Sequence, residues 1–379
     1  MQTWDVIVIG GGMAGLATTY HLARLGARTL LLQAGDLGGG TSAACSGRAQ
    51  VNEGHLDPLN VRLVREGLAR FESLEEELGA AFEWRRVGYL CLINSQSLWD
   101  EWTERAENLT AAGIPTEMLG LSDLQNAEPY LSTSGFLGAA YALEGLLNPF
   151  LFCWAYARAA QRQGATLRPQ APVTGMTVQG SKVVAVQSNG EQHCAGHVAI
   201  MCGAWTHQVA ALAGADVPIH HTHAEALITE PPPFPLHNTI GLADFYETIH
   251  GKEQAVSVGF SPMLDGSLVV AESITKSPEL HRRNSACGLA GMAADLVRLY
   301  PALAGTRVVR AWGIPTPFTP DDDPIIGWLQ ERENLFVAAG FLLTIPVIPL
   351  LCEWMARLLL GQDVPADLDQ FAPDRFRSN

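Results

Sequence analysis

WDVIVIGGGMAG, which spans residues 4–15, joins an apolar run of strand length to three spaced glycines. Apolar residues at helical spacing follow as far as Arg24, and a second apolar run, RTLLLQ, covers residues 28–33. A strand that feeds a glycine turn and a helix, followed by a second strand ending on a polar side chain, is typical of a βαβ unit. The sequence therefore predicts an α/β fold with a parallel sheet, organised around this unit.

The spacing of Gly10, Gly12 and Gly15 indicates what this turn binds. Gly10 permits a tight turn, Gly12 lets the backbone approach a pyrophosphate, and Gly15 lets the helix lie close to the strand. Free N–H groups at the N-terminus of the helix favour negative charge there. The motif predicts a dinucleotide site, and the alternative is a glycine turn in an α/β domain that binds nothing.

Composition limits the class of protein. The chain has 379 residues, 47% hydrophobic and 17% charged, so it can form two connected domains with a large core and is not disordered. A formal net charge of −15, without a long basic run, argues against nucleic-acid binding or an anionic membrane surface. Seven cysteines without a CxxC pair favour reduced thiols in the cytoplasm over disulfides, zinc or an iron–sulfur cluster.

One segment has almost the length and apolarity of a membrane span. Residues 335–352 are 18 residues with Thr344 as the only polar side chain. Gly340, Pro346 and Pro349 interrupt the segment, which favours a strand, a turn and a buried helix over a membrane span. The first residues lack a basic region, so we expect no signal peptide.

Hydrophobic periodicity and cap residues predict the other elements. Residues 34–48 are too rich in Gly and Ser for a packed element and are expected to form a functional loop. Helices are expected at residues 58–78, 98–112, 121–129, 149–163, 289–300 and 349–360, and strands at residues 82–84, 87–93, 135–141, 172–178, 182–187, 197–202, 226–229, 255–259, 267–272, 308–312 and 335–339.

The change to alternating β character after Pro218 predicts a second domain. We expect a Rossmann-like nucleotide-binding domain with a parallel sheet, and an inserted, mostly antiparallel β substrate domain that carries helices. Residues 1–80, 145–215 and 308–379 are assigned to the first domain, and residues 81–144 and 216–307 to the second. The strands at 308–312 and 335–339 are expected to return the chain to the first sheet.

Motifs along nearly the whole chain resemble one known family. They are Gly10-x-Gly12-x-x-Gly15, Gly40-Thr-Ser-Ala-Ala-Cys45, Glu144-Gly-Leu-Leu-Asn148-Pro149, Gly203-Ala-Trp205, Ala226-Leu-Ile-Thr-Glu230-Pro231, Arg310-Ala-Trp312, Thr319-Pro-Asp321 and Pro324-Ile-Ile-Gly327. In this order they resemble the FAD-dependent D-amino-acid oxidase and glycine oxidase superfamily. Within it they look most like the FAD (beta) subunits of heteromeric amine dehydrogenases: opine oxidase, D-hydroxyproline and L-proline dehydrogenases, and hydrogen cyanide synthase.

The resemblance implies FAD as the cofactor, oxidation of an amino acid to an imine, and a set of FAD-binding positions. These are Gly10, Gly12, Met13, Ala14 and Gly15 at the pyrophosphate, Gln33 and Ala34 at the adenosine ribose, Gly40, Thr41, Ser42, Ser46, Gly47 and Arg48 along the pyrophosphate and flavin ring, Val173 at the adenine, the turn residues Gly203 and Trp205, and Gly340, Phe341, Leu342, Leu343, Thr344 and Ile345 at the pyrimidine end of the flavin.

Backbone N–H groups of that last segment would stabilise the negative charge that a hydride leaves near flavin N1. The alternative is an apolar strand–helix corner without a ligand.

Three positions depart from the family pattern. Gln33 is neutral where Glu is usual, so we expect weaker nucleotide affinity. Ile314 stands where relatives carry an Arg that binds the substrate carboxylate, which makes Arg48 the first candidate for that role; alternatively, Arg48 pairs with an acid or a phosphate. The segment Phe341-Leu-Leu343 favours a hydrophobic or N-substituted substrate over glycine.

Two further side chains, His223 and Tyr246, are candidates for lining the catalytic pocket, although structural roles suit them as well. His220 and His221 lie beside His223, but we expect no metal site there. Amine oxidation by hydride transfer requires a neutral amine and not necessarily a side-chain base.

The expected activity is FAD-dependent oxidation of an amino or imino acid, a secondary amine that is opine- or proline-like, to the imine. Hydride transfer to flavin N5 would be followed by electron transfer to a partner subunit or another acceptor. One alternative is a stand-alone oxygen-using oxidase. The other is a non-catalytic FAD-binding subunit, for which the missing Arg at position 314 is the argument.

Overall fold

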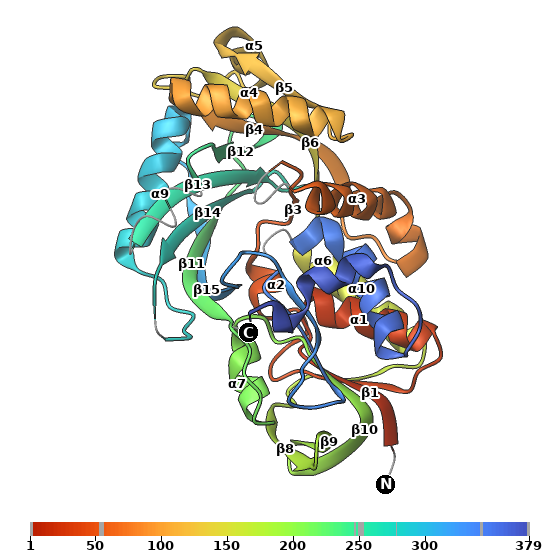
Figure 1. The fold of residues 1–379 in the computed structure, drawn as a ribbon. Coiled ribbons are helices and arrows are strands. Elements are labelled where there is room, and N and C mark those ends of the chain that lie inside the picture. Colours follow the sequence, from red (N-terminus) through yellow and green to blue (C-terminus); the bar gives the residue numbers. More distant parts are fainter. Residues whose placement is uncertain are drawn as a thin grey trace.

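The computed structural model describes residues 3–52, 57–245, 248, 254–277, 279–341 and 344–376. Two sheets organise the chain (Figure 1). Helices α1, α3, α6 and α10 gather in one part of the molecule, and α4, α5 and α9 lie around the second sheet.

The first sheet is mostly parallel and is built on β1 (Thr3–Ile9). β1 pairs in parallel with β10 (Glu191–Ile200) on one side and with β2 (Thr29–Leu32) on the other. Its core residues Val6, Ile7 and Val8 have no exposed surface, which is why β1 is a continuous apolar run and not an alternating one. The order continues outward to β7 (Thr166–Arg168) beyond β2, and to β17 (Leu335–Ala339) and the antiparallel edge strand β16 (Ile325–Trp328) beyond β10.

Helices cover one face of this sheet. They are α1 (Met13–Arg24), α3 (Pro58–Leu78), α6 (Pro149–Arg162) and α10 (Thr344–Leu359), and they share a core with Val6 and Val8. On the opposite face, Ile7 and Ile9 pack with α7 (Thr206–Ala211) and with a ribbon of β8 (Val173–Gln179) and β9 (Lys182–Ser188). β1 is therefore buried on both sides.

The second sheet is almost entirely antiparallel, and only β12 and β4 pair in parallel among its described strands. Its order is β15 (Val308–Phe318), β11 (His220–Thr229), β14 (Leu268–Thr275), β13 (Gln254–Pro262), β12 (Asn238–Leu242), β4 (Arg85–Ile93), β6 (Gly138–Leu146) and β3 (Arg48–Ala49), with β5 (Thr116–Gly120) also paired to β6. α5 (Leu121–Ala127) and α9 (Ala286–Leu299) contribute to a core on one face, and α4 (Gln96–Ala111) packs on a smaller cluster around Tyr89.

The predicted fold class is confirmed, a parallel sheet with helices joined to a mostly antiparallel sheet. Most expected helices and strands are present within a few residues. The cap residues explain two helix starts: Asp57 accepts a hydrogen bond from the Asn60 N–H, and Asn148 accepts from the N–H groups of Phe150 and Leu151. A proline takes the first helical position in both cases, where its missing N–H costs nothing.

Three local predictions were wrong. Residues 82–84 are not a strand, because the N–H groups of Phe82 and Trp84 both donate to Glu75 Oε1 and hold the chain in a turn. The Gly/Ser-rich loop contains a short helix, α2 (Thr41–Ala44). β15 does not return the chain to the first sheet: it pairs with β11 from Val308 to Phe318, so the return begins at β16.

The short strands β3, β5, β7, β12 and β16 were not predicted, because two to five residues carry too little periodicity. The apolar segment 335–352 divides into β17 and α10, as expected. Within the described ranges, no helix combines the length and apolarity that crossing a bilayer requires.

Candidate functional site

A cavity of about 590 Å³ is walled by both sheets, within the range of about 300 to 1,000 Å³ that small-molecule sites occupy. On one side lie the carboxyl ends of β1, β2, β10 and β17, including Ile9, Leu32 and Ala339. On the other side lie β11, β14 and β15, including Ala226, Ala271 and Ile314. Ligands of parallel α/β sheets bind at such strand ends.

The glycine turn after β1 fits its predicted tasks. A Cβ on Gly15 would lie 1.9 Å from the Gly10 carbonyl oxygen, and one on Gly10 would lie 2.1 Å from the Met201 carbonyl oxygen. A Cβ on Gly12 would lie 2.9 Å from Ser42 Oγ. Any side chain at these positions would displace backbone or the Ser42 hydroxyl, so the turn forms a close-fitting cradle at the start of α1.

Ser42 stabilises this end of α1 directly. Its hydroxyl accepts a hydrogen bond of 3.0 Å from the Met13 N–H, one of the first-turn N–H groups that have no partner within the helix. Gly12, Met13 and Ala14 all line the cavity. The positive end of the helix dipole is therefore available to an anion in the cavity, as a diphosphate requires.

Gln33, at the end of β2, closes the turn from the other side. Its Oε1 accepts a hydrogen bond of 2.7 Å from the Gly11 N–H, and its Nε2 donates to the Asp36 carbonyl at 3.3 Å. The amide thus uses one acceptor and one donor on the protein itself. Its second Nε2 hydrogen remains for a ligand, and this geometry supports the expectation of a weaker hydroxyl contact than Glu would make.

The loop after β2 joins the two sheets. Thr41 Oγ1 donates to the Pro315 carbonyl at 2.9 Å, and Trp312 Nε1 donates to the Ala44 carbonyl at 2.9 Å. Both hydrogen bonds connect this loop to β15. The segment that was expected to line the flavin is therefore fixed against the second sheet.

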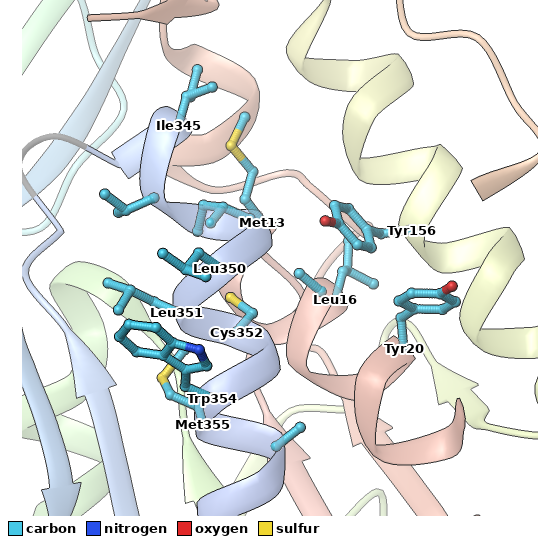
Figure 2. Close-up of a cluster of buried hydrophobic side chains, with 14 of the residues drawn as sticks. Met13, Leu16, Tyr20, Tyr156, Ile345, Leu350, Leu351, Cys352, Trp354 and Met355 are labelled. Carbon is cyan, nitrogen blue, oxygen red and sulfur yellow. The ribbon is translucent and has the colours of Figure 1, made fainter. Parts of the chain in front are cut away.

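A second helix, α10, presents its N-terminus to the same cavity. Figure 2 shows α1 and α10 packed together, with Met13 and Ile345 at the same end of the cluster. Gly340, Phe341 and Ile345 line the cavity. The positive ends of both helix dipoles thus lie beside it, although Leu342, Leu343 and the side chain of Thr344 are outside the described residues.

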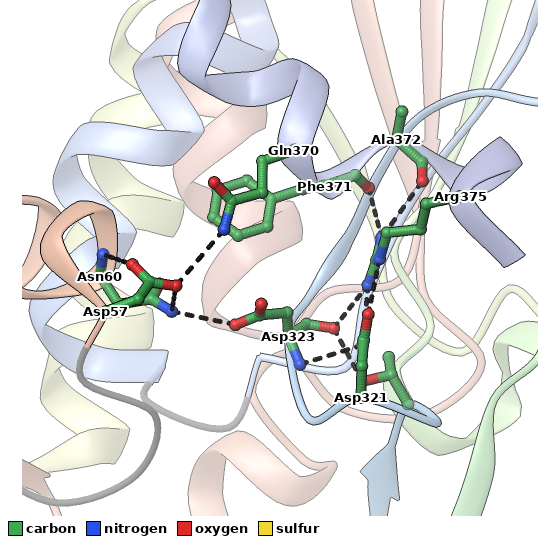
Figure 3. A network of polar contacts seen from close by, with 9 residues as sticks. Asp57, Asn60, Asp321, Asp323, Gln370, Phe371, Ala372 and Arg375 are labelled. Atoms are coloured by element: carbon green, nitrogen blue, oxygen red, sulfur yellow. Dashed lines mark hydrogen bonds and ion pairs between the residues drawn. The ribbon is translucent and has the colours of Figure 1, made fainter.

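A polar network holds the loop that packs on Gly340 (Figure 3). Arg375 donates to both carboxylate oxygens of Asp321 at 2.8 and 3.1 Å and to the Asp323 carbonyl at 2.9 Å, while Asn60 donates to the Asp323 side chain at 3.0 Å. Burial raises the pKa of the Asp321 carboxyl, but the hydrogen bonds and charge of Arg375 outweigh burial and leave that pKa below its usual value. A Cβ on Gly340 would lie 2.4 Å from Thr319 Cγ2, so the network sets the position of the cavity wall.

Arg48 pairs with an acid, Glu144, which is the alternative that the sequence left open. Its Nε and one terminal nitrogen donate to the two carboxylate oxygens of Glu144 at 2.8 and 3.0 Å. The side chains are 8% and 0% exposed, and the guanidinium lies 4.1 Å from the centre of the Tyr89 ring. Arg48 does line the cavity, but its charge is matched by a buried carboxylate, which favours a structural role over binding of a substrate carboxylate.

Of the other two catalytic candidates, only His223 lies within the described residues. His223 Nε2–H donates to the Arg283 carbonyl at 2.7 Å, and the ring packs on His281. Burial and electrostatic repulsion from His281 lower the pKa of His223. His223 does not line the cavity, and Tyr246 lies outside the described residues.

Two half-buried cysteines in the cavity wall have raised thiol pKa values. Burial raises the pKa of Cys45 to about 11 and that of Cys202 to about 12. A thiolate is the nucleophilic form of cysteine, and these shifts suppress it near neutral pH. We therefore assign no covalent role to either residue.

Most of the positions predicted to bind FAD line this single cavity. They are Gly10, Gly12, Met13, Ala14, Gln33, Ala34, Gly40, Thr41, Ser42, Ser46, Arg48, Val173, Gly203, Trp205, Gly340, Phe341 and Ile345. Gly15 and Gly47 do not line it: Gly15 packs on Gly10, and a Cβ on Gly47 would lie 2.1 Å from the Leu147 carbonyl oxygen. The contacts of these residues with FAD remain predictions.

The cavity wall also contains Gln50, Phe245, Glu272 and Arg282, which the sequence patterns did not single out. They lie outside the glycine motifs, mostly in the inserted strands and loops. In such strands the alternation of apolar and polar residues predicts the face on which a side chain lies, but not the cavity that it lines. For Arg282 the sequence carried no distinguishing signal, because Arg85 and Arg86 form another adjacent arginine pair.

Comparisons with known proteins agree with the site. A family model described as FAD dependent oxidoreductase (DAO) matches residues 5–358. The 4-methylaminobutanoate oxidase (formaldehyde-forming) of Paenarthrobacter nicotinovorans is 30% identical over 88% of this chain, which spans only 41% of that protein. Sarcosine oxidase subunit beta of an Arthrobacter species is 27% identical over 90% of this chain and 82% of that subunit.

A solved structure shows the same architecture. Glycine oxidase from Geobacillus kaustophilus matches over 100% of both chains with a TM-score of 0.89 and 25% sequence identity. The glycine cradle, the two helix N-termini and the size of the cavity are what an elongated dinucleotide requires. Since the family match runs through almost the whole chain, this protein belongs to the DAO family of FAD-dependent oxidoreductases, with FAD as its cofactor.

Proposed function

We propose that the chain oxidises an amino or imino acid, a secondary amine that is opine- or proline-like, to the imine by hydride transfer to flavin N5. The observation that carries the proposal is the continuity of one cavity. It joins the glycine cradle of α1 to an apolar wall that contains Ala224, Ala226 and Ile314. A dinucleotide along the cradle would extend its reactive ring toward that wall.

In this reaction the carbon beside the nitrogen loses a hydride, the nitrogen loses a proton, and the C–N single bond becomes a C=N bond. Bound FAD supplies the two-electron acceptor. Ala224, Ala226 and Ile314 form an apolar patch in this wall, which disfavours an unpaired ammonium group and so favours the neutral amine that hydride loss requires. The first-turn N–H groups of α1 would bind the diphosphate, with Ser42 holding the helix end.

The names of relatives support an amine substrate and, in one case, a multisubunit enzyme. One relative is an oxidase of 4-methylaminobutanoate and another is the beta subunit of a sarcosine oxidase, and both of those compounds are N-methylamino acids. We propose that electrons pass to a partner subunit or another acceptor. All seven cysteines are free, which suits a reducing compartment, and we place the activity in the cytoplasm.

The test begins with the purified chain and its flavin content. Secondary amino acids, opines and proline are added anaerobically, and loss of the oxidised flavin absorbance is followed before air is admitted. Reduction by a secondary amino acid followed by slow reoxidation supports the proposal. Rapid reoxidation by air identifies an oxygen-using oxidase. A bound flavin that none of these compounds reduces favours the non-catalytic FAD-binding subunit, for which Ile314 is the structural argument.

A further inference from the structure

Two basic side chains, Arg48 and Arg282, line the described part of the cavity. Arg48 is matched by Glu144, whose two oxygens both accept from its guanidinium. Arg282 comes from the segment between β14 and α9 and is exposed. In the described parts of the chain no carboxylate lies within ion-pair distance of Arg282, so its charge is available to a ligand.

Arg282 reaches across to the nucleotide-binding side of the cavity. Its guanidinium carbon lies 5.8 Å from the centre of the Trp205 ring. Trp205 in turn lies against the loop after β2, because a Cβ on Gly40 would be 4.0 Å from that ring. A cation over an indole face is held in position without losing its hydrogen-bond donors, and guanidinium donors match a carboxylate in pairs.

The inner wall carries an apolar side chain at position 314, where the family resemblance leads us to expect an arginine. Ile314 pairs with Ala224 and is 6% exposed, and Ala226 lies between Trp312 and Ala271 on the two neighbouring strands. These side chains form an apolar surface on three adjacent strands. A carboxylate directly beside the oxidised C–N bond would lie against this surface, with a desolvation cost and no matching charge.

We propose that Arg282 binds the substrate carboxylate at the exposed rim of the cavity, and that the substrate is an amino acid whose carboxylate is separated from the oxidised C–N bond by several bonds. This inference rests on the proposed function and narrows its substrate class to amino acids with a distant carboxylate, which excludes opines oxidised directly beside a carboxylate. A substrate carboxylate bound by Arg282 would lie at the rim of the cavity, whereas a carboxylate bound at position 314 would lie inside it. The position of the arginine therefore sets the distance between the carboxylate and the amine of the substrate. The apolar inner wall then holds the methylene groups and the neutral amine.

The test uses the FAD-loaded protein and amines of graded spacing: sarcosine, 3-methylaminopropanoate and 4-methylaminobutanoate. N-methylbutylamine replaces the carboxylate of the last compound by a methyl group. The variants are Arg282→Gln, Arg282→Lys and the matched control Arg283→Gln, since the Arg283 side chain is 76% exposed, pairs with Glu279 and does not line the cavity.

We expect the wild type to favour 4-methylaminobutanoate over sarcosine. Arg282→Gln should raise KM for 4-methylaminobutanoate about 10- to 100-fold, the loss of one charge-assisted contact. The limiting rate of flavin reduction, the FAD content and the KM for N-methylbutylamine should not change. Arg282→Lys should recover part of the loss, and Arg283→Gln should behave as the wild type.

An unchanged KM in Arg282→Gln, or an equal rise for N-methylbutylamine, overturns the inference while leaving the proposed function intact. If the wild type prefers sarcosine, the proposed distance between carboxylate and oxidised C–N bond is wrong. If Arg282→Gln loses FAD, the arginine binds the diphosphate of FAD and not the substrate, which also overturns the inference. If no amine reduces the wild-type flavin, the proposed function fails. Binding of hexanoate, read from the flavin spectrum, then decides the role of Arg282: equal affinity in wild type and Arg282→Gln would refute carboxylate binding.

Discussion

The buried pair of Arg48 and Glu144 allows a direct choice between a structural arginine and a substrate-binding one. The perturbations are Arg48→Met, Glu144→Gln and the double variant. Because both side chains are nearly inaccessible and share two hydrogen bonds, removing one partner leaves a buried uncompensated charge. Such a change costs about 3–5 kcal/mol, and loss of the contact with the Tyr89 ring adds about 0.5–2 kcal/mol for Arg48→Met.

The double variant should recover most of this loss. The amide introduced by Glu144→Gln can still accept the hydrogen bond that Thr239 Oγ1 donates to the carboxylate, and the thioether introduced by Arg48→Met fills the space of the arginine stem without a charge. We expect the summed losses of unfolding free energy in the two single variants to exceed the loss in the double variant by at least about 2 kcal/mol. Urea denaturation of the apo and FAD-loaded forms measures this coupling.

Substrate kinetics complete the choice. If Arg48 is structural, the double variant regains the KM of the wild type for whichever amine reduces the flavin. If Arg48 binds the substrate carboxylate, KM stays raised in the double variant although stability returns. A loss below about 1 kcal/mol for Arg48→Met, or a coupling energy near zero, would refute the reasoning from burial.

Three further outcomes are expected. Gln33→Glu should tighten FAD binding about fivefold in flavin titrations of the apoprotein, because a carboxylate strengthens the bond from the Gly11 N–H and frees an oxygen for the ribose; unchanged affinity would contradict this. Arg375→Ala should weaken FAD binding and cost roughly 1–3 kcal/mol of unfolding free energy, since the loop beside Gly340 loses its anchor, whereas Gln370→Ala, which removes one bond of 3.4 Å, should do neither. Burial, followed by the charges of Arg24 and Arg70, lowers the pKa of His21 from 6.5 to about 3. Below pH 6.5 His21 is therefore protonated in the unfolded chain but not in the native chain, and the unfolding free energy falls as the pH decreases to about 3. His21→Gln should remove about 5 kcal/mol of the fall in unfolding free energy across that window, measured by urea denaturation at a series of pH values, and parallel pH profiles of the two proteins would show that His21 is not responsible.

Local patterns explain how much of the fold could be predicted. The continuous apolar run of β1 indicates burial on both faces, and Asp57 and Asn148, each followed by a proline, mark helix starts. These signals act over a few residues, so they can be read without knowing the fold. The turn at residues 82–84 was misread because its hydrogen-bond acceptor, Glu75, lies in the preceding helix and not in the pattern itself.

The sequence by itself determined the βαβ unit with its glycine turn and the α/β class, and through the family resemblance it predicted the FAD-binding positions and an apolar residue at position 314 in place of an arginine. Only the tertiary structure decided that Arg48 pairs with Glu144, that β15 belongs to the second sheet, and that Arg282 reaches the cavity. The physical reason is distance along the chain. Glycine turns and caps are local steric and hydrogen-bonding requirements, whereas a buried charge finds its partner 96 residues away only when two strands pair.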